Sequence, residues 1–320
     1  MKLIKTLIFS FIFFLFSCDM QTVVDLEIPT HVPVLVLNGL LSSDTNAQVV
    51  VSHSVGAFSN LTPNYIDDAK VQIYKNNELQ DSLFMDISND VYVYFSPSDN
   101  SIDSLQMYYY TSTYIPDEKG ANYRIEVKHP DYNSISAETY IPADISLYNI
   151  NTDTSSIPGK IRLTFSFDDD SDIQNYYALR LFSSCTKQWI DEYGYNQEFG
   201  FRGDTDFMSN DPSFPSEIPF DGYTFQGDNV VFTDALFNGQ RKTIRLDVES
   251  ELSYADCDTV IIKFSTFSND TYLYYNSLEE HSDKGELGLF GGEVIPVYSN
   301  VENGLGTLIS TNFQEIILKP

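Results

Sequence analysis

The feature that most constrains the fold is a succession of short runs rich in β-branched and aromatic residues, each ending at a turn signal. Val91–Phe95 reads V-Y-V-Y-F, Tyr123–Val127 places charged residues between apolar ones, and Ile161–Phe167 alternates strictly. Such runs favour a pleated surface over a helix. Strands that recur about every 8–12 residues with turns between them are typical of an antiparallel sandwich. The chain is therefore expected to be all-β and mainly antiparallel.

The length of 320 residues predicts two domains, because one domain typically takes about 100–200 residues. A first series of strands ends at Pro142, and a second begins at Ile145. We predict two immunoglobulin-like or transthyretin-like β-sandwich domains, over residues 34–143 and 144–320. In the second, the Asn238–Gly239 pair between two strand-like runs predicts a hairpin.

Two segments of the second domain depart from the strand pattern. Residues 186–227 are rich in Gly, Asp, Tyr and Pro and show little periodicity, which predicts a long loop. Such a loop inside a compact domain is unusual and is commonly functional. Near the C-terminus, Ser268 or Asn269 can cap a helix with Asp270 in its first turn. One short helix is expected there, over about residues 270–282.

The N-terminus reads as an export signal with a lipid attachment site. Lys2 and Lys5 precede the apolar run Leu7–Phe16, and Ser17 and Cys18 follow. This run is too short for a transmembrane helix and matches the apolar region of a secretory signal. Leu15-Phe16-Ser17-Cys18 resembles a lipobox, so residues 1–17 are predicted to be a lipoprotein signal peptide, with Cys18 lipidated and residues 18–33 a tether. The alternative is a plain signal peptide with a coincidental cysteine.

The two remaining cysteines, Cys185 and Cys257, are a candidate disulfide, because thiols outside the cytoplasm often pair. The Asp168–Asp172 run is a weak calcium candidate through Asp168, Asp170 and Asp172. It lacks the spacing of an EF-hand loop, and a solvated acidic turn is the simpler interpretation. No other metal site and no cofactor is expected.

Recognition is expected in the predicted loop, which carries Trp189, Tyr193, Tyr195, Phe199 and Phe201. Aromatic side chains in a loop on a rigid sandwich could bind a glycan or a peptide. The alternative is that they belong to a strand-rich core. No G-x-S-x-G, H-E-x-x-H or P-loop motif occurs, so catalytic residues are not predicted. The 18 basic and 46 acidic residues give a net charge of −28, which opposes binding to nucleic acid.

A series of motifs resembles a family of Bacteroidota lipoproteins known as domain of unknown function 4249. In the first half these are Leu35–Leu41, Ala69–Tyr74, Gly120–Val127 and Ser136–Pro142. In the second half they are Phe165–Leu179, Val231–Gln240, the helix around Tyr272, and Tyr298–Gly306, which reads Y-S-N-V-E-N-G-L-G. The resemblance implies a β-sandwich lipoprotein of the outer membrane, whose gene commonly accompanies that of a TonB-dependent receptor. It implies no catalytic residues.

These observations lead to one expected function and two alternatives. We expect a non-enzymatic, lipid-anchored binding or accessory protein that works with a TonB-dependent receptor in nutrient or cargo capture. We expect it at the outer membrane, on the cell surface rather than the periplasmic face. The alternatives are a free-standing structural or adhesive surface module and, third, an enzyme acting on surface glycans.

Overall fold

The computed structural model describes residues 30–56, 64–96, 101–216, 222–249, 256–285 and 295–319. The predicted signal, Cys18 and the tether as far as residue 29 lie outside these residues. The fold is all-β and mainly antiparallel, with sandwich-like packing and one helix near the C-terminus, which confirms the predicted class. Among the described residues, no helix is long and apolar enough to cross a membrane.

The strands form two lobes. The N-terminal lobe contains β1 (Leu35–Ser42), β2 (Gln48–His53), β3 (Asn64–Tyr65), β4 (Lys70–Lys75), β5 (Glu78–Ser96), β6 (Ser101–Thr111), β7 (Asn122–His129) and β8 (Tyr132–Tyr140). The C-terminal lobe contains β9 (Tyr148–Thr154), β10 (Lys160–Asp168), β11 (Tyr176–Ile190), β12 (Asn196–Asp204), β13 (Phe207–Ser209), β14 (Phe225–Gly227), β15 (Asn229–Thr233), β16 (Arg241–Glu249) and β17 (Asp256–Phe267). The chain ends with α2 (Asn269–Gly285), β18 (Val301–Glu302) and β19 (Leu305–Leu318).

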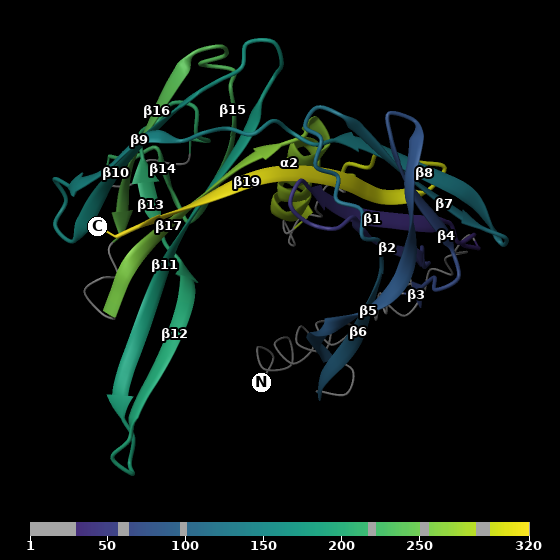
Figure 1. Cartoon of the computed structure of the whole chain (residues 1–320), viewed down its shortest axis with the longest axis horizontal. Coiled ribbons are helices and arrows are strands. Elements are labelled where there is room, and N and C mark those ends of the chain that lie inside the picture. Colours follow the sequence, from purple (N-terminus) through teal and green to yellow (C-terminus); the bar gives the residue numbers. More distant parts are fainter. Residues whose placement is uncertain are drawn as a thin grey trace, which may run out of the picture.

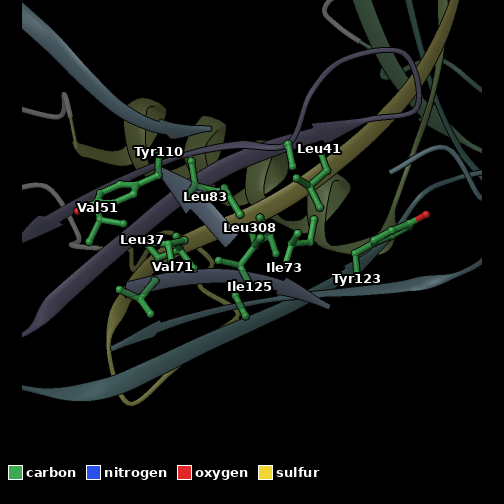
Figure 2. Close-up of a cluster of buried hydrophobic side chains, with 14 of the residues drawn as sticks. Leu37, Leu41, Val51, Val71, Ile73, Leu83, Tyr110, Tyr123, Ile125 and Leu308 are labelled. Carbon is green, nitrogen blue, oxygen red and sulfur yellow. The ribbon is translucent and has the colours of Figure 1, made fainter. Parts of the chain in front are cut away.

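Each lobe has its own hydrophobic core. In the N-terminal lobe, Leu37, Val51, Ile73 and Ile125 project into a cluster shared by two layers of strands (Figure 2). In the C-terminal lobe, the sheet in the order β14-β13-β16-β10-β9 packs on β11, β17 and β15. Burial alternates along β7 as the sequence predicts, because only one face of this strand meets the core. In β10 the apolar residues Leu163, Phe165 and Phe167 face the core, but Ser166 between them is buried as well.

The C-terminal strand β19 joins the two lobes. Its first half pairs in parallel with β1, from Val36 opposite Leu305 to Ser42 opposite Thr311. Its second half pairs antiparallel with β17. In Figure 1 it runs as one long yellow strand from one lobe to the other. Leu308 consequently belongs to the N-terminal core, and Ile316 packs on the C-terminal core.

This arrangement changes the predicted division of the chain at residue 143. The division separates most of the two cores, but the assignment of all residues from 144 to 320 to the second sandwich does not hold. Residues 301–311 complete the N-terminal lobe, where β18 pairs with β8 and β19 pairs with β1. Periodicity within a strand cannot reveal a partner about 270 positions away.

The register corrects the predicted hairpin, whereas the predicted helix is confirmed. The Asn238–Gly239 turn exists, with Gly239 at a φ of 70°, but it does not close a hairpin. β15 pairs with β11, whereas β16 pairs with β10 and β13, so the turn connects the two layers of the sandwich. The helix prediction of about residues 270–282 agrees with α2, Asn269–Gly285.

Candidate functional site: a projecting aromatic hairpin

The sequence predicts one long loop over residues 186–227, but the structure places residues 186–190 and 196–204 in two paired strands. β11 continues to Ile190 and β12 returns from Asn196, and the two strands pair without interruption from Phe182 opposite Asp204 to Ile190 opposite Asn196. We call residues 185–201 the aromatic arm. Figure 1 shows the teal β11–β12 hairpin extending well away from the body of the C-terminal lobe. Nearly all of β12 is exposed, so the arm has no core face to impose an alternating pattern on its sequence.

The tip of the arm is an ordered turn. The backbone N–H of Asp191 donates to the carbonyl oxygen of Tyr195 at 2.9 Å, and Gly194 takes a φ of 85°. One carboxylate oxygen of Asp191 accepts hydrogen bonds from the backbone N–H groups of Tyr193 and Tyr195, at 3.0 and 2.8 Å. The bond from Tyr195 is the main reason why the pKa of Asp191 lies below its usual value. The tip therefore presents its two tyrosines from a defined turn.

All five predicted aromatic residues lie on this arm, and all are exposed. Tyr193 and Tyr195 at the tip are 77% and 69% exposed, and Phe199 is 58% exposed. Trp189 lies opposite Gln197, and Phe199 and Phe201 follow at alternate positions, so Trp189, Phe199 and Phe201 share one face. The rings of Phe199 and Phe201 are stacked, with centroids 6.2 Å apart.

The opposite face of the arm is largely polar. It carries Gln188 and Glu198, whose side chains are hydrogen-bonded at 3.0 Å, together with Thr186, Asn196 and the exposed Ile190. The arm is thus amphipathic although it touches no core. Exposed large apolar side chains that share one face indicate an interaction surface.

A second hairpin projects from the N-terminal lobe. β5 leaves its partner β4 at Leu83, and from Phe84 onward it pairs with β6 as far as Ser96 opposite Ser101. In Figure 1 the β5–β6 hairpin and the aromatic arm both extend toward the bottom of the view. Phe84 and Ile87 are exposed on β5. The sequence predicts strands in this stretch but not their projection from the lobe, because composition does not show which side chains are exposed.

The base of the aromatic arm is held by a disulfide at Cys185. The backbone register places Cys185 of β11 directly opposite Cys257 of β17, next to an irregularity in the pairing. Facing positions on neighbouring antiparallel strands lie within the distance that a disulfide spans. The register therefore favours the predicted Cys185–Cys257 bond, which stays a prediction for the partner cysteine.

The carboxylates of the acidic run are engaged by neighbouring donors. Asp168 accepts hydrogen bonds from Tyr148 and Arg241, at 2.6 and 3.1 Å, and Asp169 accepts one from Tyr177. Asp170 accepts the backbone N–H of Asp172 at 3.0 Å. Within the described part of the chain, no group of three or more His, Cys, Asp or Glu side chains is arranged to hold a metal ion. Asp168, Asp170 and Asp172 lie at the end of β10 and in the turn that leads to β11, where the chain passes from one sheet to the other.

Comparison with solved structures gives weak likenesses. A crystal structure of a Salmonella alpha-2-macroglobulin mutant is 10% identical, with a TM-score of 0.24, and the match covers 90% of this chain and 15% of that one. The yeast delta-COP-I mu-homology domain is 8% identical, with a TM-score of 0.23, over 90% of this chain and 97% of that one. No curated protein matches the sequence.

One family model matches nearly the whole chain. The model described as "Domain of unknown function (DUF4249)" matches residues 21–317. This span includes both lobes, the aromatic arm, and the Tyr298–Gly306 motif. The chain belongs to this family.

Proposed function

We propose that this protein is a lipid-anchored accessory of the outer membrane that contacts a TonB-dependent receptor through its aromatic arm. The observation that carries the proposal is the exposed apolar face formed by Trp189, Phe199 and Phe201 on the aromatic arm, since these three described side chains belong to neither core. Aromatic side chains in a preorganised element are effective anchors because they bury large areas at small entropic cost.

The proposed anchor supports the same role. Cys18 would be attached to lipid, and the tether would connect it to β1 of the N-terminal lobe. Confinement of both partners to one membrane raises their effective concentration, so a contact as small as one hairpin face can suffice. Growth with a labelled fatty acid should label the wild-type protein and leave Cys18→Ser unlabelled. Equal labelling of both proteins would contradict the anchor.

The partner is tested by recovery of affinity-tagged, lipidated protein in mild detergent. We expect an outer-membrane receptor encoded nearby to be recovered with the wild type. Phe199→Asp combined with Phe201→Asp should abolish that recovery, because the charge lies on the apolar face. Glu198→Lys combined with Gln188→Lys is the matched control on the polar face, and it should leave recovery intact.

Two results would overturn the proposal. One is recovery of the tagged wild type alone, under conditions in which a known receptor–lipoprotein pair survives. The other is equal recovery of the receptor by the variants of both faces. The first result would favour a free-standing structural or adhesive surface module. The stacked Phe199 and Phe201 rings would then be tested on surface glycans, since flat aromatic faces suit sugar rings.

A further inference from the structure

A groove of about 490 Å³ crosses the sheet where the two lobes meet. Its lining comes from β1, β11, β15, β17, β19 and α2. The groove is on the face of β11 opposite the C-terminal core, because its residues Ala178 and Arg180 alternate with the buried Leu179 and Leu181. Its volume lies within the range of small-molecule sites, about 300–1,000 Å³, which occur preferentially between lobes.

The strand register explains why the surface is hollow there. Ala178 of β11 lies directly opposite Ser265 of β17, and Ser265 lies opposite Phe313 of β19. Two small side chains, Ala178 and Ser265, thus lie side by side on the floor of the groove. Two residues further along the strands, Phe267 stacks on Tyr275 of α2, with ring centroids 5.6 Å apart. An aromatic wall therefore bounds one end of the hollow.

The other end of the groove carries two cations. Arg180 lies directly opposite Lys263, an arrangement of like charges that is unfavourable on neighbouring strands. Arg180 is paired with Asp204 at 2.9 Å. No described carboxylate forms a salt bridge with Lys263, whose ammonium group lies 4.1 Å from the ring centroid of Phe313.

The carboxylate that faces Lys263 on the neighbouring strand is already bonded to another side chain. Glu315 lies opposite Lys263 in the register, but Arg202 binds both of its oxygens, at 2.9 and 3.3 Å. Among the described residues, the ammonium group of Lys263 therefore has no direct carboxylate contact at the edge of the hollow, although its charge acts together with that of Arg202 to lower the pKa of Glu315. In a chain with 18 basic and 46 acidic residues, this is a local reversal of charge. Charge complementarity therefore selects an anion as the occupant.

We propose that this groove binds a small organic anion with an apolar body. Lys263 and Arg180 hold the anionic group, and the body lies on Ala178 and Ser265 between Phe313 and the aromatic wall. Lys263 and Phe267 are four residues apart on β17, which is roughly 13 Å at about 3.3 Å per residue. A carboxylate with an extended chain of medium length matches that distance. The inference stands on these contacts and does not depend on the receptor.

Octanoate is the test ligand, and isothermal titration is the measurement. Residues 18–320 with Cys18→Ser provide the chain after signal removal without a need for detergent. We expect saturable binding of octanoate, and binding at least about tenfold weaker for octan-1-ol and octylamine, because neither molecule can form the charge-assisted hydrogen bonds of the carboxylate. Lys263→Gln should weaken octanoate binding by a similar factor, whereas Lys70→Gln on β4 should leave it unchanged.

A second pair of variants tests the hollow itself. Ala178→Leu should abolish octanoate binding by filling the centre of the groove, and Ser265→Val serves if the first variant does not fold. Near-ultraviolet circular dichroism reports whether each variant keeps its tertiary packing. The inference is overturned by the absence of saturable binding, by equal affinity for octan-1-ol, or by full affinity in Lys263→Gln. None of these results bears on the aromatic arm, whose apolar face lies on the other side of β11.

Discussion

At the scale of single residues, one carboxylate connects three segments of the C-terminal lobe. Asp247 of β16 is buried and accepts hydrogen bonds from Ser155 at 2.7 Å, Tyr223 at 2.8 Å and Arg162 at 3.0 Å. Burial alone would raise the pKa of Asp247, but the bonds from Ser155, Tyr223 and Arg162 outweigh it, so the pKa is lowered. The ionised form is therefore the one that the folded protein stabilises.

Asp247→Asn should lower the free energy of unfolding by about 1–3 kcal/mol at pH 7, because buried partners lose a charged acceptor. A carboxyl group whose folded pKa is depressed stabilises the fold above its unfolded pKa, about 3.9. That stabilisation is lost as the pH falls through the folded pKa. The difference between wild type and variant should thus shrink between pH 7 and pH 3 in urea unfolding. Glu279→Gln, on the exposed side of α2, is the control, and a difference that persists at pH 3 would contradict the assignment.

The Tyr298–Gly306 motif contains a glycine that no other residue can replace without strain. Gly306 takes a φ of 100°, and a Cβ atom there would overlap the carbonyl oxygen of Leu37. Gly120 takes a φ of 75° but has open space around it. Gly306→Ala should therefore destabilise the protein by several times the effect of Gly120→Ala, which carries only the conformational cost of about 1 kcal/mol. Thermal unfolding of both variants measures this, and equal shifts in Tm would refute the steric argument.

At the scale of elements, the aromatic arm is separable from the fold. Residues 187–199 contribute no side chain to the C-terminal core. Replacement of these residues by Asn-Gly should leave Tm within a few degrees of wild type, because loss of exposed surface removes little stabilisation. A large loss of stability would show that the arm supports the sandwich. If the variant without residues 187–199 still recovers the proposed receptor, the contact lies outside the aromatic arm.

The disulfide at the base of the arm gives a second prediction at this scale. A Cys185–Cys257 bond closes a loop of about 70 residues and should stabilise the protein by about 4 kcal/mol in the chain-entropy model. Alkylation under denaturing, non-reducing conditions should find neither thiol free. Cys257→Ser should lower the free energy of unfolding and leave Cys185 reactive. Two free thiols in the wild type would exclude the bond.

At the scale of the whole molecule, β19 makes the lobes interdependent. The N-terminal lobe needs the pairing of Val36–Ser42 with Leu305–Thr311, and the C-terminal lobe needs Thr311–Leu318 beside β17. Asn300 ties β19 to β8 within the N-terminal lobe, since its side chain bonds the backbone of Glu138 and Leu308 at 2.8–2.9 Å. We expect one cooperative unfolding transition in calorimetry. Truncation after Glu302 should unfold both lobes, and two separate transitions in the intact chain would contradict this coupling.

The sequence predicted the class of structure well, because strand content and the helix are local properties. Tyr123–Val127 alternates because one face of β7 is buried, and the apolar positions of Ile161–Phe167 likewise face a core. The aromatic arm escaped detection because a strand exposed on both faces needs no alternation. The five aromatic residues were identified, but their common face depends on the pairing of β11 with β12. Arg180 and Lys263 are 83 positions apart in the numbering, and only the register brings them together.

The parallel pairing of β1 with β19 has a consequence for biogenesis. A polypeptide emerges N-terminus first, so β1 is made long before the strand that covers one of its edges. Until the last residues arrive, that edge presents unpaired backbone groups on which other chains can add. The pairing of β1 with β19 is expected to form slowly, because the chain must lose the entropy of the long segment between these strands before the native contacts stabilise it. A chain that terminates before β19 cannot complete either lobe, so synthesis of this strand is itself a condition for folding, and products that lack it remain open to proteolysis.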